Sequence, residues 1–201
     1  MSRIVFATGN ENKLREIRQI MKDLKVDIIS MKEAGIDIDI EETGTSFEQN
    51  ALIKARAIWE IIGGIVMADD SGLIIDYLNG EPGIYSARYM GENTSYTEKN
   101  KKILERMADA KGEERSARFV AAIACILPDG KEIVAQETME GLIAEEIAGE
   151  NGFGYDPILY LPEYSCTSAQ LSDEEKNSIS HRGKALRLMR EKLQNENISC
   201  Q

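Results

Sequence analysis

The sequence predicts an α/β domain built on a mixed β-sheet with flanking helices. Two observations predict this class: a strand–helix–strand order opens the chain, and two apolar runs joined by a tight turn follow later. The first order favours parallel strands, because a parallel pair needs a crossover connection between its members. The second favours an antiparallel hairpin. A sheet that contains both kinds of pairing is mixed.

The opening elements lie within residues 1–29. Residues 3–7 form an apolar run with β-branched side chains, which is typical of a buried strand. Asn10 can cap the helix that follows, and residues 26–29 form a second strand. The helix itself is predicted from apolar residues at helical spacing, namely Leu14, Ile17, Ile20, Met21 and Leu24.

A second helix and a third strand come next. Ser46 and Gln49 have the spacing of a capping box, in which Ser46 caps the helix and the Gln49 side chain reaches back to the backbone of Ser46. A pair of glycines ends this helix. Residues 65–68 form a strand that ends at Asp69 and Asp70, and the Ser-Gly pair after them favours a turn.

The second half of the chain contains a lysine-rich helix, a hairpin and a last helix. The lysine-rich helix spans residues 96–110, and its basic cluster at 99–102 is interpreted as a solvated face. The hairpin joins residues 118–127 to 132–138, because an Asp-Gly pair favours the positive φ angles of a tight turn. The last helix covers residues 182–195.

Length and composition describe one water-soluble domain over residues 1–201. The chain is 42% hydrophobic and 29% charged, and its net charge is −11. This acidity argues against general binding to nucleic acid, since duplex binding needs a basic face. The sequence shows neither a signal peptide nor a membrane span, so we expect a cytoplasmic protein without a membrane partner.

Cysteine and histidine usage limits the metal chemistry. Cys125, Cys166 and Cys200 are the three cysteines, they lie far apart, and His181 is the single histidine. They provide neither a disulfide framework nor a zinc site. A metal ion would therefore be a hard cation held by carboxylates and water, such as Mg²⁺ or Mn²⁺.

A polar motif follows the first strand. Thr8, Gly9 and Asn10 lie at a strand-to-helix junction, where backbone N–H groups and the helix dipole favour an anion. Lys13 can reach a phosphate from the first turn of the helix. A helix that is simply capped after a buried strand explains the same residues equally well, so both interpretations stay open.

Acidic pairs occupy two positions between the ends of the chain. Asp69 and Asp70 repel each other at the end of a strand, and either a divalent cation or a solvated turn relieves that repulsion. Adjacent strand residues point to opposite faces, so both carboxylates point inward only if the chain turns there. The pair Glu41 and Glu42 is by default a pair of surface acids.

Two later motifs have residues suited to a nucleotide base. Phe153 stands between two glycines, which can expose its ring for stacking, and Asp156 can accept from a base N–H; a turn that buries the ring is the alternative. Arg182 lies near a helix start, where its charge opposes the helix dipole. Its paired donors fit keto and ring-nitrogen acceptors of a purine, unless it is simply a surface charge.

Six blocks follow one another in order and extend over nearly the whole chain. The blocks are Thr8-Gly9-Asn10-x-x-Lys13, Ser46-Phe47-x-x-Asn50-Ala51-x-x-Lys54-Ala55, Ala68-Asp69-Asp70-Ser71-Gly72-Leu73, Pro82-Gly83-Ile84-Tyr85-Ser86-Ala87-Arg88-Tyr89, Gly152-Phe153-Gly154-Tyr155-Asp156-Pro157 and Glu174-Glu175-Lys176-Asn177-x-Ile179-Ser180-His181-Arg182-Gly183. Together they resemble the inosine triphosphate pyrophosphatase family, which removes non-standard purine nucleoside triphosphates.

The resemblance implies an elongated fold with two lobes around a central nucleotide-binding cleft, a homodimer and dependence on Mg²⁺, with Mn²⁺ as an alternative. The implied reaction hydrolyses ITP, dITP and XTP to the monophosphate and pyrophosphate, which cleanses the nucleotide pool. Asp70 is implied as the proton acceptor and, with Glu41, as a metal ligand; Asp69 is an alternative ligand. The implied substrate-binding residues are Thr8, Gly9, Asn10, Lys13, Lys54, Ser71, Arg88, Phe153, Gly154, Tyr155, Asp156, Lys176, His181 and Arg182.

Selection of the base follows from the implied roles. Donors from His181 and Arg182 suit the keto group at C6 of hypoxanthine and xanthine, and they would face another donor, the amino group, in adenine. GTP keeps the keto group, and the sequence does not show how it is rejected. Two departures from the family pattern are Gln49 and Gln170, which stand where many members have glutamate.

Two other functions compete with this one. A Maf-like pyrophosphatase for modified pyrimidine nucleotides would share the reaction, but the Ser180–Gly183 and Gly152–Pro157 blocks argue against it. A purine sensor without turnover is the second alternative. Lys13, Glu41 and Asp70 argue against a sensor, because a sensor has no need of a metal and water site.

Overall fold

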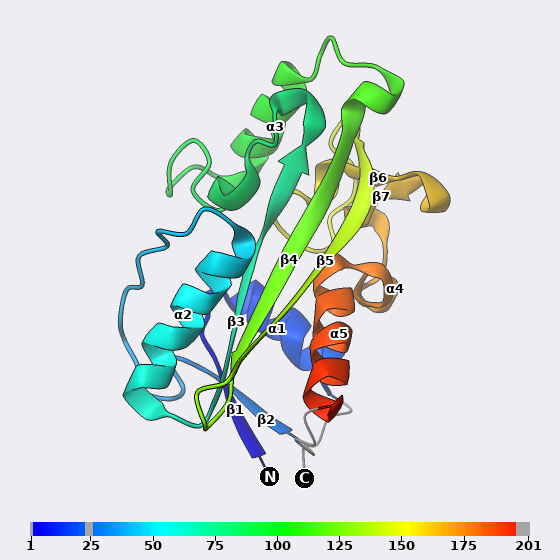
Figure 1. Cartoon of the computed structure of the whole chain (residues 1–201). Helices are drawn as coiled ribbons and strands as arrows, with labels where there is room; N and C mark the ends of the chain where they lie inside the picture. The colour runs from blue at the N-terminus through cyan, green and yellow to red at the C-terminus, as the bar shows by residue number, and fades with distance from the viewer. Residues whose placement is uncertain (1, 23–25, 196–201) are drawn as a thin grey trace. The chain divides into compact units, whose positions relative to one another are not determined.

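The structure is a computed structural model that describes residues 2–22 and 26–195 (Figure 1). It is an α/β fold around one seven-stranded sheet, ordered β2-β1-β3-β4-β5-β6-β7. The strands are β1 (Ser2–Phe6), β2 (Val26–Ser30), β3 (Ile65–Ile75), β4 (Ser116–Ile126), β5 (Glu132–Ile143), β6 (Leu159–Leu161) and β7 (Cys166–Thr167).

The sheet combines both kinds of strand pairing. β1 pairs in parallel with β2 and with β3. β6 pairs in antiparallel with β5 and with β7. The mixed α/β sheet predicted from the sequence is therefore confirmed. The helices in the described residues are α1 (Glu11–Ile20), α2 (Phe47–Ile62), α3 (Tyr96–Arg106), α4 (Asp173–Ile179) and α5 (His181–Asn195).

The chain divides into two compact units. The first comprises Met1–Asp70, Ala121–Glu137 and His181–Gln201, and the second comprises Ser71–Val120 and Thr138–Ser180. The long strands β3, β4 and β5 contribute residues to both units. Each unit has a hydrophobic core of its own. A single domain over residues 1–201 stays a prediction.

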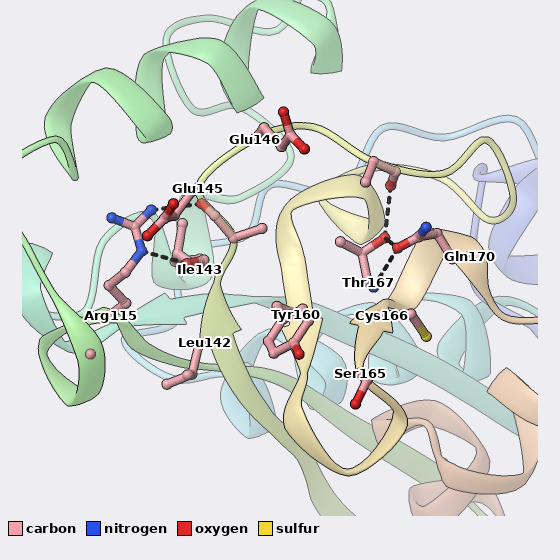
Figure 2. Close-up of a pocket in the computed structure, with 13 residues that line it drawn as sticks. Arg115, Leu142, Ile143, Glu145, Glu146, Tyr160, Ser165, Cys166, Thr167 and Gln170 are labelled. Atoms are coloured by element: carbon pink, nitrogen blue, oxygen red, sulfur yellow. Dashed lines mark hydrogen bonds between the residues drawn. The ribbon is translucent and has the colours of Figure 1, made fainter.

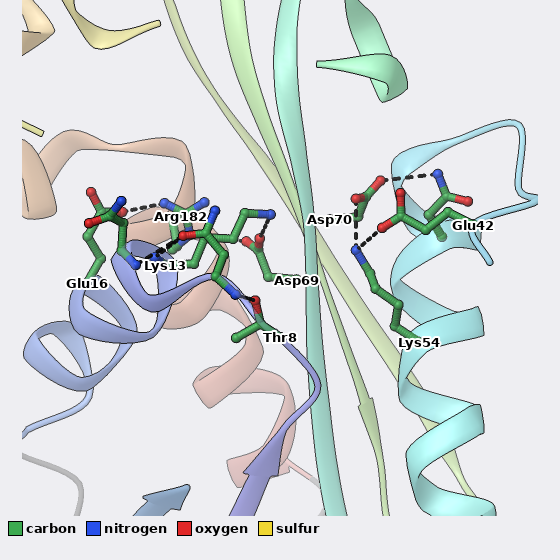
Figure 3. A network of polar contacts seen from close by, with 11 residues as sticks. Thr8, Lys13, Glu16, Glu42, Lys54, Asp69, Asp70 and Arg182 are labelled. Atoms are coloured by element: carbon green, nitrogen blue, oxygen red, sulfur yellow. Dashed lines mark hydrogen bonds and ion pairs between the residues drawn. The ribbon is translucent and has the colours of Figure 1, made fainter. Parts of the chain in front are cut away.

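The first unit has helices on both faces of its strands. α1 and α5 contact each other, and their apolar faces join those of β1 and β4 in one buried cluster that includes Phe6, Ile17, Ile123 and Met189. Figure 3 shows α2 on the other side of β3 from α1. This arrangement buries the strands on two faces, which explains the continuous apolar runs of the sequence.

The two predicted helix caps are present in the first unit. The side chain of Asn10 accepts from two backbone N–H groups of the first turn of α1, at 3.0 and 3.2 Å. Ser46 accepts from the backbone of Gln49 at 3.2 Å. Gln49 does not reach back to Ser46: its side-chain oxygen accepts from the backbone and the hydroxyl of Thr45, at 2.8 and 3.0 Å. The reciprocal half of the capping box is thus shifted by one residue.

The third strand is longer than predicted. β3 continues through both aspartates as far as Ile75, so the turn expected after Asp70 is wrong. Leu73 and Ile75 supply the reason, because both are buried in the core of the second unit and favour continued extension. The hairpin is confirmed: the backbone N–H of Gly130, at a φ of 84°, donates to Leu127 at 2.9 Å between β4 and β5.

The helices of the second unit differ from expectation in two ways. α3 begins at the predicted residue, but Lys99 and Asn100 are 1% and 3% exposed, so the solvated face predicted for residues 99–102 is wrong at these two positions. α4 was not predicted. Its start does have the capping-box spacing, and the side chain of Ser172 accepts from the backbone of Glu175 while Glu175 accepts from Ser172.

The outermost strands are β2 and β7. Arg18 donates two hydrogen bonds to the carbonyl of Ile28, at 3.1 and 3.0 Å, and Glu33 accepts from the backbone of Ser30 at 2.7 Å. These side chains occupy backbone groups of β2, and β7 is only two residues long. Within residues 2–22 and 26–195, every helix is too short or too polar to span a lipid bilayer.

Candidate functional site

Two neighbouring aspartates of β3 anchor separate polar clusters in the first unit (Figure 3). Asp69 lies on the side of α1 and α5. Its carboxylate pairs with Lys13 at 2.5 Å and with Arg182 at 3.1 Å. Glu16, on α1, pairs with a second nitrogen of the Arg182 guanidinium. The four side chains form a buried chain of alternating charge, Glu16–Arg182–Asp69–Lys13, which we call the Asp69 cluster.

The charges of the Asp69 cluster stabilise one another. Burial alone would raise the pKa of Asp69, but Arg182 and Lys13 outweigh it and hold that pKa well below its usual range. Burial lowers the pKa of Lys13 in spite of Asp69. Arg182 is 2% exposed, so it is not a surface charge. Two carboxylates, those of Glu16 and Asp69, hold its guanidinium. Its contact with a nucleotide base stays a prediction.

Asp70 lies on the opposite face of β3, toward α2. Lys54 places its Nζ 2.9 Å from Asp70 and 2.6 Å from Glu42. Asn50, which is buried, donates to the second oxygen of Asp70 at 3.3 Å and accepts from the backbone of Gly44 at 2.8 Å. A side chain at Gly44 would collide with Asn50, so the loop needs glycine there. We call Asp70, Glu42, Lys54 and Asn50 the Asp70 cluster.

The Asp70 cluster has the reverse electrostatics of the Asp69 cluster. Burial raises the pKa of Asp70 above its ordinary value even though Lys54 is adjacent. Burial disfavours the ammonium of Lys54, but Asp70 and Glu42 outweigh it and raise the pKa of Lys54. A carboxylate that holds protons more readily than usual, beside a firmly charged lysine, has the properties of a general base near an anion.

The acidic residue that pairs with Lys54 beside Asp70 is Glu42, the chain neighbour of Glu41. Glu41 is exposed, whereas Glu42 is half-buried against Lys54, which fits the alternation of side chains along an extended segment. Asp69 points away from both Glu42 and Asp70, so the carboxylates of the two aspartates lie on different faces of β3. The metal roles of Glu41 and Asp69 stay predictions.

The Asp70 cluster fits a hard cation. In the part of the chain that the structure describes, no three His, Cys, Asp or Glu side chains meet as a ready-made metal site. Mg²⁺ does not need one, since it commonly uses one or two carboxylates and completes its shell with water and substrate phosphates. Glu42 and Asp70 provide two such carboxylates around the single charge of Lys54.

The junction between β1 and α1 is capped by its own side chains. The hydroxyl of Thr8 accepts from the backbone of Asn10 at 3.1 Å, and Asn10 caps the helix. Apart from its two chain neighbours, no atom of the described residues lies within 4 Å of the position that a side chain at Gly9 would take. The capped-helix interpretation is confirmed, and a phosphate site at this exposed junction stays a prediction.

A second group of predicted residues lies in the second unit, around the carboxylate of Asp156. Asp156 is 2% exposed, and one of its oxygens accepts from the backbone of Phe153 at 2.8 Å and from Lys176 at 2.7 Å. Its other oxygen accepts from the hydroxyl of Ser168 at 2.9 Å. The Lys176 ammonium lies 5.3 Å from the ring centroid of Phe153. Asp156 therefore shapes the loop, while Phe153 stays half-exposed.

The remaining predicted residues are placed as follows. Tyr155 is buried, and its hydroxyl donates to the carbonyl of Ser86 at 2.8 Å. Arg88, close by in the chain, lies half-exposed with its guanidinium 5.0 Å from the ring centroid of Tyr85. Ser71 is half-buried in β3 in the second unit, and His181 is buried at the first residue of α5 in the first unit.

Sequence reasoning did not assign roles to Glu16, Glu42, Asn50 and Ser168. A signal existed for Glu16, which lies three residues after Lys13 on one face of a helix. Asn50 belongs to a motif of the resemblance that implies no role for it, and the acidic surroundings of Glu42 in the sequence favour a surface position. Ser168 carried no sequence signal, because its contact with Asp156 depends on the fold of the second unit.

A cavity of about 490 Å³ lies elsewhere in the second unit (Figure 2). Tyr160, Cys166 and Gln170 line it, together with Arg115, whose guanidinium donates to backbone carbonyls such as that of Ile143 at 2.6 Å. None of the predicted site residues lines this cavity. Among the described residues, Cys125 and Cys166 are not joined in a disulfide, and Cys200 lies outside the described residues.

Comparisons with known proteins agree with the motifs. A model described as the Ham1 family matches residues 4–192. A dITP/XTP pyrophosphatase of Clostridium perfringens is 46% identical over 199 residues, covering 96% of this chain and 98% of the relative. One from Caldanaerobacter subterraneus is 47% identical over 192 residues, covering 95% and 96%.

A solved structure gives the same result. The Ham1 protein of Staphylococcus aureus superposes with a TM-score of 0.87 at 44% sequence identity. The match covers 97% of this chain and 100% of that protein's chain. The shared fold, the near-complete coverage and the matching motifs agree with one another. The chain belongs to the Ham1 family.

Proposed function

We propose that this protein is a Mg²⁺-dependent pyrophosphatase of non-standard purine nucleoside triphosphates, which hydrolyses dITP, ITP and XTP to the monophosphate and pyrophosphate. The observation that carries the proposal is the Asp70 cluster, in which a buried carboxylate of raised pKa lies 2.9 Å from the ammonium of Lys54. Relatives at 46% and 47% identity are named dITP/XTP pyrophosphatases, and this supports the substrate class.

Asp70 acts as the proton acceptor in this proposal. Water attacks the α-phosphorus, and the bond from that phosphorus to the oxygen that bridges it to the β-phosphate breaks. Pyrophosphate leaves, and a proton of the water passes to Asp70. The raised pKa of Asp70 favours this transfer near neutral pH, whereas Asp69 is held ionised by Lys13 and Arg182 and is a poor acceptor.

Lys54 and the metal ion offset the charge of the phosphates. Lys54 is raised in pKa and therefore stays protonated beside the developing negative charge. Glu42 and Asp70 would hold Mg²⁺, with Glu41 as the ligand that the resemblance implies. When bound, Mg²⁺ supplies electrostatic stabilisation of phosphate oxygens.

The base would be recognised in part by the loop around Phe153. Its half-exposed ring offers a face for stacking, and Lys176, fixed by Asp156, keeps a cation beside that ring. Selection of a keto group at C6 by His181 and Arg182 belongs to the same proposal. So do a homodimer and a cytoplasmic location, and sedimentation of the purified protein tests the dimer.

The experiment is pyrophosphate release from dITP, XTP, ITP, GTP and ATP, each with Mg²⁺, with Mn²⁺ and with EDTA. Fast release from the first three, lost in EDTA, is the expected result. The matched control is Asp70→Asn, which keeps the size of the side chain. If the wild type releases pyrophosphate from none of these purine nucleotides, the proposal is overturned. Release from modified pyrimidine nucleotides would then indicate the Maf-like enzyme, and purine binding without turnover would indicate the sensor.

A further inference from the structure

Lys99 is a buried lysine without an acidic partner. It lies on α3 with 1% of its surface exposed, donates to the carbonyl of Ala87 at 2.6 Å, and has its Nζ 4.8 Å from the ring centroid of Tyr96. Among the described residues no carboxylate pairs with it, and burial lowers its pKa. Burying an ammonium costs stability, and the hydrogen bond to Ala87 and the ring of Tyr96 offset part of that cost. An apolar side chain would fill the same space without this cost, so the donor of Lys99 is the property to explain.

The next residue of the same helix holds a different loop. Asn100 is 3% exposed, and its amide donates to the carbonyl of Gly154 at 3.1 Å. Gly154 follows Phe153 directly. Two consecutive residues of α3 thus hold two loops of the second unit, residues 83–89 and residues 152–157, by their backbone carbonyls.

The loop of residues 83–89 depends on such contacts because it has little regular structure of its own. It contains one short 3₁₀ turn, Gly83–Tyr85. Beyond that turn, Tyr155 donates to the carbonyl of Ser86 and Lys99 donates to the carbonyl of Ala87. These are the two peptide groups immediately before Arg88, so the two donors fix the point from which the Arg88 side chain starts.

Tyr96, on the same helix, packs against the loop of residues 152–157. Its ring lies edge to face with that of Tyr155, with centroids 5.2 Å apart. It also lies 3.6 Å from the position that a side chain at Gly154 would occupy. A helix is a rigid support, and residues mounted on it can hold loops more closely than the loops hold themselves.

We propose that Lys99 and Asn100 are positioning residues, a brace on α3 that sets the placement of Arg88 and Phe153 for the nucleotide. The inference rests on the proposed function, since Arg88 and Phe153 are substrate-binding residues only within it. A lysine suits the task because its long stem crosses the buried space and its ammonium still donates to a carbonyl at the far end.

The main test is Lys99→Met, which keeps the length of the side chain and removes the donor. The expected result is a rise of about tenfold in KM for dITP with kcat changed by less than about threefold, because misplaced binding loops weaken substrate binding while the Asp70 cluster is intact. The melting temperature is expected to stay level or rise, since a buried charge is removed. Lys101→Met, an exposed lysine of the same helix, is the matched control and leaves KM unchanged.

A double-mutant cycle shows whether Lys99 acts through Arg88. In an Arg88→Ala background, Lys99→Met is expected to change KM by less than about twofold, because the residue that it positions is gone. Asn100→Leu is a second variant. It is expected to displace the loop of Phe153, and so to raise KM while kcat stays near the wild-type value. It keeps the test decisive if Lys99→Met does not fold.

The outcomes separate the two proposals. If the wild type hydrolyses dITP and the KM is unchanged in both Lys99→Met and Asn100→Leu, the positioning role of these residues is overturned and the proposed function stands. Additive effects of Lys99→Met and Arg88→Ala on KM overturn the claim that Lys99 acts through Arg88. Absence of wild-type turnover on dITP and XTP overturns the proposed function, and the brace with it.

Discussion

Asp69 and Asp70 are consecutive residues of β3, yet their carboxylates belong to two separate clusters on opposite faces of the strand. Asp69 pairs with Lys13 and Arg182, and Asp70 pairs with Lys54. Their pKa values shift in opposite directions. One strand thus presents a permanently charged structural carboxylate and a more basic carboxylate suited to proton transfer.

Asp69→Asn is expected to destabilise the protein strongly. The change leaves Lys13 and Arg182 buried without one of their carboxylates, and breaking a buried pair in this way typically costs about 3–5 kcal/mol. Urea unfolding at neutral pH, followed by circular dichroism, measures the free energy of unfolding. A loss below about 1 kcal/mol would contradict the assignment of Asp69 to a buried ion-pair cluster.

The same residue makes stability depend on acid pH. The pKa of Asp69 in the folded protein lies below its ordinary value of 3.8, so the unfolded chain binds more protons in that range. Its contribution to stability is therefore complete above 3.8 and is lost as the pH falls toward the folded pKa. We expect the free energy of unfolding to rise less steeply between about pH 2 and pH 4 in Asp69→Asn than in the wild type.

Asp70→Asn is expected to abolish pyrophosphate release from dITP and to cost less stability than Asp69→Asn. Burial already disfavours the charge of Asp70, so a neutral side chain of the same shape is tolerated better. Steady-state kinetics and the same urea unfolding measure the two effects. A kcat within about tenfold of the wild type would remove Asp70 from its role as proton acceptor.

Gly152→Ala is expected to raise the KM for dITP. Gly152 has a φ of 72°, and a side chain there would lie 2.3 Å from the Asp156 carboxylate and 3.0 Å from the Lys176 ammonium. Gly80→Ala is the matched control, because Gly80 has a φ of 89° with open space around it. Both variants carry about 1–2 kcal/mol of backbone strain. Only Gly152→Ala also displaces the ion pair of Asp156 and Lys176. Equal KM values in the two variants would contradict a positioning role for that pair.

Ser46→Ala is expected to lower the free energy of unfolding by about 1 kcal/mol through loss of the cap of α2. Gln49→Ala removes a different contact, the hydrogen bonds to Thr45, and serves as the comparison. Thermal melts of the two variants test whether the cap depends on Ser46 alone. A Ser46→Ala variant that melts at the wild-type temperature would contradict the stabilising role of this cap.

Features that depend on a few neighbouring residues were predictable from the sequence. Asn10 and Ser46 cap their helices as expected, because a cap needs only a short polar side chain and the next turn. The apolar runs located β1 to β5 for the same reason, whereas the short strands β6 and β7 were not predicted. α4 was not predicted although Ser172 and Glu175 have the capping-box spacing. The helix is only 7 residues long, which is too short to show an apolar periodicity.

Features that depend on distant parts of the chain were not predictable. Arg182 and Glu16 are 166 residues apart, and only the contact of α5 with α1 brings them together. Lys99 looked solvated because its sequence neighbours are polar, yet the loop of Ala87 covers it. The sequence also does not show that Glu42 pairs with Lys54, because this contact depends on how the loop before α2 lies against that helix.

The occupied backbone groups of β2 bear on how this protein behaves when it is concentrated. A sheet with free outer strands recruits strands from neighbouring molecules and grows into aggregates. Here Arg18 and Glu33 already bind the carbonyl of Ile28 and the N–H of Ser30, and β7 at the other edge offers only two residues. Intermolecular sheet growth must first break these hydrogen bonds, so the fold carries its own barrier to fibril formation.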